Sequence, residues 1–364
     1  MCSFTLKNPK MSTENKKGKI TMKKVLALLM AVVMMFSLVA CGGGETGGDA
    51  DVTTYKVGVA IYQFDDNFMT NYRNELVDYF KTKETDTVKY EVTLVDGKND
   101  MATQTDQIRN FITQGMDIII CNLVQTSSAD AIIDEVVAAE IPLVLINREP
   151  LAYDADKKPI VEGYAGILDN PTVCYVGADA RQSGTYQGEI VLELPDKGDI
   201  DGDGVIRYVM VVGDPENIDA QFRTEFSVKA LVDAGMEVEC LVEQIGNWAT
   251  DQGQTITANA ITAHGDKIDV VFCNNDGMAL GAKAAIDAAG LKVGEDLYLL
   301  GVDALPEAIE LIKEGGMTGT VLNDHIAQSH AAVDAAVDVL AGGEMQNYYW
   351  ANYAKVDKAY VDAQ

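Results

Sequence analysis

The sequence predicts an α/β protein with two Rossmann-like lobes, each built on a parallel sheet. Its 364 residues exceed what one hydrophobic core usually serves, and the 48% that are hydrophobic are enough for two. Short apolar runs rich in β-branched residues alternate with segments that repeat apolar residues at helical spacing. Such alternation is typical of parallel sheets covered by helices.

A first series of patterns occupies residues 55–147 and predicts the first lobe. Strands are indicated over Val57–Ile61, Tyr90–Val95, Asp117–Asn122 and Ile141–Asn147. Helices are indicated between them over Tyr72–Lys81, Gln104–Thr113 and Ala129–Ala139. The run from Asp117 to Asn122 is continuously apolar at its centre, as expected for a strand buried on both faces.

The regular pattern breaks over Arg148–Pro171, which is interrupted by prolines and glycines, and a second series follows. Strands are indicated over Val173–Val176, Ile206–Val212, Met236–Val242, Ile268–Cys273, Leu297–Val302 and Thr318–Leu322. Helices are indicated over Ala180–Leu194, Arg223–Ala234, Asp251–Ala263, Met278–Ala289, Pro306–Glu314 and Asn323–Leu340. We place lobe 1 at residues 55–147 and 323–349, and lobe 2 at residues 148–322 and 350–364. A three-strand hinge is then expected near Asn147–Pro150, Leu322–Asp324 and Tyr349–Asn352.

The N-terminus has the pattern of an export signal. Lys23 and Lys24 precede the apolar run Val25–Val39, which is short for a membrane span of about 20 residues. Leu38-Val39-Ala40-Cys41 resembles the lipobox of bacterial lipoproteins. We therefore predict a signal peptide over residues 1–40, with Met22 as an alternative start. The resemblance implies a lipidated Cys41, and a flexible tether is expected over residues 41–54.

The net charge excludes some classes of partner, and the positions of the cysteines indicate whether disulfides are expected. Without residues 1–40, which carry seven lysines and one glutamate, the chain has 21 basic and 55 acidic residues and a net charge of −34. Nucleic acid and anionic lipid are therefore not expected as partners. Buried free thiols are expected in preference to disulfides at Cys121, Cys174, Cys240 and Cys273.

Polar and aromatic side chains gather just beyond the predicted strand ends. They are Asp66, Phe68, Asn122, Asn217, Asp219, Arg223, Trp248, Asn275, Asp303 and Asn323. In open parallel sheets ligands bind at the carboxyl ends of the strands. Carboxylates accept hydrogen bonds from sugar hydroxyls, Arg donates, Asn does both, and aromatic rings suit the apolar faces of a pyranose. The alternative interpretation is that several of the Asp and Asn residues only cap helices.

The loop Tyr62–Met69 contains two of these candidates. We expect Asp66 to accept from a sugar hydroxyl and Phe68 to offer its ring to an apolar face of the sugar. Asp65 and Asn67 are expected to shape the turn.

From about Tyr55 onward the chain resembles the periplasmic galactose/glucose-binding proteins of sugar ABC transporters, which have the type 1 periplasmic binding protein fold. The resemblance rests on an ordered set of short motifs: Asp65–Met69, Asn122–Val124, Asn147 with Glu149–Pro150, Asn274–Asp276, Gly301–Ala308 and Gly319–Asp324. It implies that nine of the ten strand-end residues, all except Asn217, bind a hexose, with Phe68 and Trp248 on its two faces. Asn217 departs from the family, which usually has His there, so the sugar preference is not determined.

An acidic loop, Asp199–Arg207, has the spacing of a calcium loop, with carboxylates at Asp199, Asp201 and Asp203 and a glycine at its sixth position. The resemblance implies a structural Ca²⁺ held by these carboxylates, by Val205 and by the distant Asp269. Arg207 stands where the family has a neutral ligand, and a guanidinium cannot coordinate a cation. Two interpretations remain open, a bound calcium and a metal-free loop in which Arg207 pairs with the aspartates.

The sequence thus predicts a monomeric, extracytoplasmic, lipid-anchored protein that binds glucose or galactose and delivers it to an ABC permease without chemistry. A sugar-sensing partner of a chemoreceptor or sensor kinase is one alternative. A surface-tethered hydrolase is another, and no nucleophile elbow, Walker loop or dinucleotide fingerprint follows any predicted strand to support an enzyme.

Overall fold

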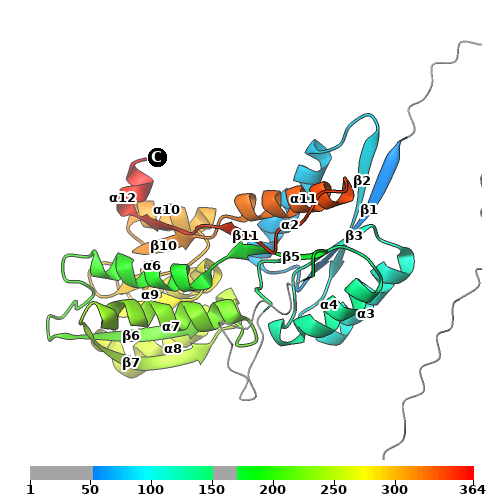
Figure 1. Ribbon diagram of the computed structural model, residues 1–364. Helices are drawn as coiled ribbons and strands as arrows, with labels where there is room; N and C mark the ends of the chain where they lie inside the picture. The colour runs from blue at the N-terminus through cyan, green and yellow to red at the C-terminus, as the bar shows by residue number, and fades with distance from the viewer. Residues whose placement is uncertain (1–51, 151–169) are drawn as a thin grey trace, which may run out of the picture. The chain divides into compact units, whose positions relative to one another are not determined.

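The computed structural model describes residues 52–150 and 170–364. The predicted signal peptide, Cys41 and most of the tether lie outside these residues. The described chain forms two six-stranded sheets, in which all strand pairs are parallel except β10 with β12. The predicted fold class is confirmed (Figure 1). Within the described ranges, no helix is both long and apolar enough to cross a membrane.

The first sheet has the strand order β11-β5-β4-β3-β1-β2. Its strands are β1 Thr53–Ile61, β2 Val88–Asp96, β3 Ile118–Cys121, β4 Leu143–Ile146, β5 Val173–Ala178 and β11 Tyr348–Ala351. Its helices are α2 Asn67–Thr82, α3 Met101–Gln114, α4 Ala129–Ala138 and α11 His325–Leu340, with the 3₁₀ turn η1 Thr126–Ser128. The helices α2 and α11 pack on one face of the sheet, and α3 and α4 pack on the other.

The second sheet has the strand order β12-β10-β9-β8-β6-β7. Its strands are β6 Val205–Val212, β7 Glu237–Ile245, β8 Val270–Cys273, β9 Tyr298–Leu300, β10 Gly319–Leu322 and β12 Ala354–Asp357. Its helices are α6 Ala180–Leu192, α7 Ile218–Asp233, α8 Thr250–His264, α9 Asp276–Ala288, α10 Pro306–Glu314 and α12 Lys358–Asp362, with the 3₁₀ turn η2 Gly265–Lys267. Again one core lies on each face of the sheet.

The short central strands follow directly from their sequences. All four residues of β3, Ile-Ile-Ile-Cys, are buried, as are all four of β4, so both faces of these strands are covered. The preceding helix α3 ends at Gly115, whose φ of 65° belongs to the left-handed region that glycine adopts without strain. The continuous apolar runs therefore predicted the strands β3 and β4 correctly, and the glycine predicted the end of α3 correctly.

The predicted first passage between the lobes was wrong. The strand β5 pairs in parallel with β4, from Leu143 opposite Val173 to Ile146 opposite Val176, and so belongs to the first sheet. The chain passes to the second sheet at Asp179, and not at Asn147–Pro150. A break in local sequence periodicity does not show to which sheet the next strand belongs, because sheet membership is decided by backbone pairing between distant segments.

The other two passages lie between β10 and α11, and between β11 and β12. The strand β11 pairs with β5 and β12 pairs with β10. We call residues 52–150, 170–178 and 325–351 the first lobe, and residues 180–322 and 354–364 the second lobe. Three connections therefore join the lobes, at Asp179, at Asn323–Asp324 and at Asn352–Tyr353.

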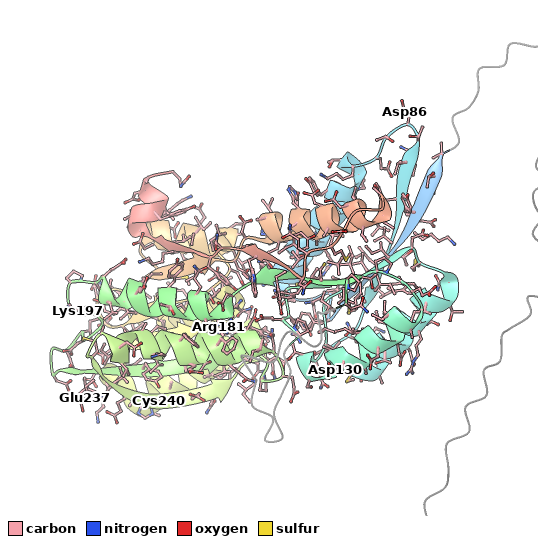
Figure 2. The ribbon with its side chains drawn as sticks, in the orientation of Figure 1. Asp86, Asp130, Arg181, Lys197, Glu237 and Cys240 are labelled. Atoms are coloured by element: carbon pink, nitrogen blue, oxygen red, sulfur yellow. The ribbon has the colours of Figure 1, made fainter. Side chains whose placement is uncertain are left out.

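The four cysteines of the described chain are free, but they do not share one environment. Cys121, Cys174 and Cys273 are buried in central strands, as predicted. Cys240 is exposed, because it lies on β7, the edge strand of the second sheet (Figure 2). The prediction of burial was wrong for this residue, since apolar neighbours in sequence do not show which strand forms the edge.

The contact between α8 and α9 depends on a glycine. A Cβ added at Gly281 would lie 1.9 Å from the carbonyl oxygen of Thr250. We expect Gly281→Ala to lower the free energy of unfolding by about 2 kcal/mol or more, because overpacking against backbone outweighs the helix propensity gained. Urea denaturation would measure this change.

The matched control is Ala284→Ser, which adds one atom on the exposed face of the same helix. This variant should stay within about 0.5 kcal/mol of the unmodified protein. Equal unfolding midpoints for the two variants would contradict the close packing of α8 on α9.

Candidate functional site

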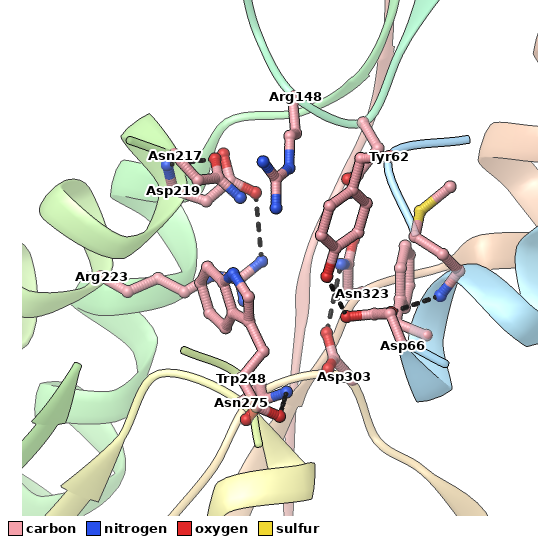
Figure 3. A pocket seen from close by; sticks show the side chains of 13 residues that line it. Tyr62, Asp66, Arg148, Asn217, Asp219, Arg223, Trp248, Asn275, Asp303 and Asn323 are labelled. Carbon is pink, nitrogen blue, oxygen red and sulfur yellow. Dashed lines mark hydrogen bonds and ion pairs between the residues drawn. The ribbon is translucent and has the colours of Figure 1, made fainter. Parts of the chain in front are cut away.

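A pocket lies where strand ends of both sheets meet, and it contains most of the predicted candidates (Figure 3). Its lining residues are Tyr62, Asp66, Phe68, Met69, Asn147, Arg148, Asn217, Asp219, Arg223, Trp248, Asn275, Asp303 and Asn323. Nine of the ten strand-end candidates are in this set, and the exception is Asn122. Residues that are up to 257 positions apart in the sequence are thereby brought to one site, although their part in ligand binding stays a prediction.

Three of the predicted site residues both cap a helix and line the pocket. Asp66, Asn217 and Asn275 are the N-cap residues of α2, α7 and α9. Their side-chain oxygens accept hydrogen bonds from backbone N–H groups at 2.6, 3.0 and 2.9 Å respectively. Asp66 was expected to bind ligand while its neighbours shaped the turn, but its Oδ1 itself caps the helix. Its Oδ2 accepts from the hydroxyl of Tyr62 at 2.8 Å.

A buried ion pair lies on the second-lobe side of the pocket. Arg223 Nη2 is 3.3 Å from Asp219 Oδ2, and both residues are 3% exposed. Arg223 also donates to the Asn274 carbonyl at 2.8 Å and to the Tyr353 hydroxyl at 3.2 Å. Burial opposes the charge of Arg223, but Tyr353, Asp219 and Asp303 outweigh it and raise its pKa. The guanidinium is therefore a fixed cation in the pocket wall.

Asp303 presents a second buried carboxylate to the pocket. Its Oδ1 accepts from Asn323 Nδ2 at 3.2 Å, and Asn323 Oδ1 in turn accepts from Gln328 Nε2 at 2.6 Å. Burial raises the pKa of Asp303 well above its usual value, and the charge of Arg223 partly opposes this rise. Hydrogen bonds therefore link Asp303 in the second lobe to Asn323 in the connection between the lobes, and Asn323 to Gln328 in α11.

Several residues around the pocket have strained backbones. The φ angles of Asn147, Trp248 and Asp303 are 60°, 65° and 126°, in a region that residues other than glycine rarely adopt. Strain of this kind costs on the order of 1–3 kcal/mol per residue and is concentrated at functional sites. The three residues all follow strand ends, so the strain turns their side chains toward the same pocket.

The two predicted aromatic rings both line the pocket. Phe68 lies on the first-lobe side, where His325 contacts it edge-on with ring centroids 6.2 Å apart. Trp248 lies on the second-lobe side, over Gly213, where an added Cβ would come within 2.2 Å of the indole ring. Gly213 therefore makes room for the ring, a requirement that the sequence did not reveal.

Asn122 does not line the pocket, contrary to its place in the predicted set. It is fully buried and accepts from the Tyr62 N–H at 3.3 Å. It also donates to the Ile146 carbonyl at 3.1 Å and to Asn147 Oδ1 at 3.2 Å. Asn122 thus connects the ends of β1, β3 and β4 from behind the lining residues.

Arg148 is the main pocket residue that the sequence reasoning missed. It is 1% exposed, and its guanidinium carbon lies 3.7 Å from the centroid of the Tyr62 ring. Its Nη1 donates to the Val124 carbonyl at 2.5 Å and pairs with Asp214 at 3.3 Å. Its Nε and Nη2 have no hydrogen-bond partner in residues 52–150 and 170–364. The signal in the sequence was an arginine two positions after the apolar strand Leu143–Ile146.

The pocket combines two arginines, three carboxylates, four asparagines and three aromatic rings around one space. In Figure 3 the labelled side chains converge on a common centre, with Arg223 and Trp248 facing Tyr62 and Asp66. Buried donors and acceptors at many angles suit a ligand that carries several hydroxyl groups. The lining residues include no serine, cysteine, lysine or histidine that would serve as a nucleophile or its base.

The acidic loop is tied by an arginine. Asp199, Asp201 and Asp269 bring carboxylate oxygens within 4.8 Å of one another, but Asp203 is not in this group. Arg207 Nη2 contacts Asp203 at 2.7 Å, and its Nε contacts Glu239 at 3.1 Å.

These residues do not fit the calcium site that the resemblance implies. Calcium takes six to eight oxygen ligands, and here one expected carboxylate is held by a cation. The same guanidinium lies 3.8 Å from Asp201, which is in the three-carboxylate group. Asp199 accepts three hydrogen bonds from backbone N–H groups of its own loop, so the loop is closed by hydrogen bonds and ion pairs.

Comparison with known proteins agrees with the fold. Residues 57–344 match the periplasmic binding protein domain family. The chain is 33% identical over 309 residues to the D-galactose/methyl-galactoside binding periplasmic protein of Haemophilus influenzae, covering 84% of this chain and 86% of that protein. It is 32% identical over 304 residues to a protein of Rhizobium meliloti that is named for rhizopine binding, covering 83% and 90%.

A solved structure supports the same relationship. An ABC transporter solute binding protein from Bacillus halodurans, with bound myo-inositol, superposes with a TM-score of 0.71 and 27% identity. The similarity covers 87% of this chain and 98% of that one. The resemblance expected from the strand-end motifs is therefore confirmed, and the chain belongs to the periplasmic binding protein family, a family of binding proteins and not of enzymes.

Proposed function

We propose that the protein binds a hexose, glucose or galactose, between its two lobes and delivers it to an ABC permease. The observation that carries this proposal is the pocket to which both lobes contribute buried hydrogen-bonding groups and aromatic rings, Tyr62 and Phe68 from the first lobe and Trp248 from the second. A relative that is 33% identical is named for binding D-galactose and methyl-galactoside. The predicted set of sugar-binding residues and the lining of the pocket overlap in nine residues.

The pocket favours a ligand rich in hydroxyl groups because its polar atoms are already oriented. Asn323 is held by Gln328, and Arg223 by Asn274 and Tyr353, so little side-chain entropy would be lost on binding. Phe68 and Trp248 would cover the apolar faces of the sugar ring. Because the pocket wall is buried, a hydroxyl that is missing or inverted would leave a protein group unpaired and would weaken binding.

Ligand capture in this proposal requires the lobes to move about their three connections. Asp179, Asn323–Asp324 and Asn352–Tyr353 are short segments between elements that belong to different sheets. Rotation about such segments would open the pocket to ligand and close it again. The permease would then recognise the closed, ligand-bound form.

The family is extracytoplasmic, and we further propose that Cys41 is lipidated and anchors a monomer to the outer face of the membrane. The basic, apolar and small-residue pattern of residues 22–41 supports this proposal. A role as the partner of a chemoreceptor or sensor kinase is compatible with the same sugar site. For the acidic loop we propose a metal-free structure, in which Arg207 supplies the positive charge.

Isothermal titration with D-glucose, D-galactose, D-ribose and myo-inositol tests the proposed function. We expect one of the hexoses to bind most tightly, and Asp303→Ala to weaken its binding at least 10-fold, about 1.4 kcal/mol. The physical reason is that a desolvated acceptor is lost opposite a sugar hydroxyl.

The control is Asp100→Ala, which removes the carboxylate that caps α3 and belongs neither to the pocket nor to the three connections between the lobes. This variant should melt at a lower temperature but keep the sugar affinity. Tighter binding of myo-inositol or ribose than of either hexose would replace the hexose proposal, and no binding of any of the four would refute it.

Arg148→Met tests the arginine that the sequence reasoning missed. The variant keeps an unbranched side chain on Tyr62 but removes donors that face the pocket, so we expect at least a 10-fold loss of hexose affinity. Titration calorimetry measures the loss.

The matched control is Arg73→Met. Arg73 also stacks on an aromatic ring, 4.4 Å from the centroid of Phe64, and donates to the Phe64 carbonyl, but it does not line the pocket. Its replacement should leave the affinity unchanged. Equal affinities of the two variants would show that Arg148 does not contact the ligand.

Chelation tests the metal-free acidic loop. We expect EDTA to leave the melting temperature of the unmodified protein unchanged, because Arg207 already neutralises Asp203 and Glu239. Arg207→Gln should lower the melting temperature and make it rise on addition of calcium.

Arg109→Gln is the control, since it removes an arginine that pairs with Glu135 at the surface of the other lobe. Calcium should not affect its melting temperature. A fall in the melting temperature of the unmodified protein on chelation would establish a bound metal and overturn the metal-free loop.

A further inference from the structure

Asp276 is a fully buried carboxylate that lies directly behind the pocket without lining it. It is the first residue of α9 and follows the pocket residue Asn275. Its Oδ1 accepts from the Thr320 hydroxyl at 2.6 Å, and its Oδ2 accepts from the Leu305 N–H at 2.8 Å. Its own backbone N–H donates to the Val302 carbonyl at 2.7 Å.

These contacts bracket the most strained dipeptide of the pocket. Asp303 and Ala304 have φ angles of 126° and 54°, and the residues on either side of them, Val302 and Leu305, are both bonded to Asp276. Thr320 reaches the same segment, since its hydroxyl oxygen is 3.4 Å from the Ala304 N–H. The backbone conformation that turns the Asp303 side chain into the pocket is therefore held from one residue, through the Asp276 carboxylate at Leu305 and through the Asp276 backbone N–H at Val302.

The surroundings reserve space for this carboxylate. A Cβ added at Gly301 would lie 2.2 Å from Asp276 Oδ1, so only glycine fits there while Asp276 keeps its position. No ion pair of Asp276 within 4.0 Å exists in the described ranges, and burial of a carboxylate without such a pair is unfavourable. Helix capping does not account for Asp276, because Asn275 already caps α9 through Met278.

We propose that Asp276 is a positioning residue for ligand binding, which holds the 302–305 loop so that the Asp303 carboxylate faces the ligand. The proposal rests on the proposed sugar-binding function of the pocket. Asp276 would not touch the ligand, and its effect on affinity would pass through the backbone of Asp303. Thr320 has the same positioning role, because its hydroxyl donates the second hydrogen bond to the Asp276 carboxylate.

The proposed role of Asp276 predicts that ligand affinity depends on pH. Burial raises the pKa of Asp276 to about 6, against the opposing effects of the Thr320 hydroxyl, the Leu305 N–H and Arg223. The other titratable groups near it are Asp303 and Cys273. A protonated Asp276 is a weaker acceptor for the loop, so ligand affinity should fall as the pH drops through about 6.

The contribution of the same group to folding stability has the opposite sign. A carboxyl whose pKa is raised on folding binds its proton more readily in the folded state than in the unfolded chain. The stability it contributes is therefore present at low pH and is lost as the pH rises through about 6. If Asp276 positions Asp303, a rise in pH through about 6 should increase the ligand affinity and decrease the folding stability that Asp276 contributes. If Asp276 were purely structural, only the folding stability would change.

The test compares Asp276→Asn and Thr320→Val with the unmodified chain. The affinities for D-glucose and D-galactose are measured from pH 5 to pH 8, and hydrogen exchange of the Leu305 amide is measured without sugar. We expect Asp276→Asn to lower the affinity at least 10-fold at pH 7.5, to reduce its dependence on pH between 5 and 7 to the part that Asp303 causes, and to speed exchange at Leu305. Thr320→Val should lower the affinity about 3-fold, since it removes one hydrogen bond of the set.

Tyr298→Phe is the matched control, because it removes a hydroxyl bond to Asp196 at the opposite end of the strand β9. It should leave the affinity and the Leu305 exchange unchanged. Unmodified affinity and pH profile in Asp276→Asn would overturn the proposal. If that variant does not fold, unmodified affinity in Thr320→Val together with unchanged exchange at Leu305 would overturn it. Failure of the unmodified chain to bind either sugar would instead refute the proposed function, while Leu305 exchange would still show whether Asp276 holds the loop.

Discussion

The parallel pairing of the strands is the constraint on which the candidate site depends. In each lobe the strands that lead to the pocket run in one direction, so their carboxyl ends, and the polar residues that follow them, lie at one edge of the sheet. The two sheets then contribute opposite sides of the same pocket. An antiparallel strand would have sent its terminal residue to the other edge, and the only antiparallel strand, β12 in the described chain, contributes no lining residue.

Burial of charge is the second requirement, and the pocket meets it with fixed partners. Arg223 is held by Asp219, Asn274 and Tyr353, and Asp303 by Asn323, so these groups do not depend on water for their hydrogen bonds. Burial nevertheless raises the pKa values of Asp219 and Asp303. The carboxylates are thus held ready for donors that a ligand would supply, and this readiness is maintained by residues behind the pocket.

Strain and support occur together in the structure. Asn147 is contacted by Asn122 and by the Tyr175 hydroxyl, Trp248 is accommodated by Gly213, and Asp303 is bracketed by the contacts of Asp276. Each left-handed backbone therefore has a specific neighbour that makes it possible. In the acidic loop of the second lobe the unfavourable feature is repulsion between carboxylates, and Arg207 compensates for it by pairing with Asp203 and Glu239.

The sequence by itself determined the features that depend on local pattern. Apolar periodicity predicted the strands β1 to β10 and the helices from α2 to α11, but not β11, β12 and α12. The alternation of strands and helices predicted parallel sheets, and the polar and aromatic residues after the strands included nine lining residues. Only the tertiary structure decided the features that depend on distant pairing. Hydrogen bonds with β4 placed β5 in the first lobe, packing put Asn122 behind the pocket, and stacking on Tyr62 brought Arg148 into it. Local spacing carries no information on which distant groups meet, because those contacts arise only when the two sheets assemble.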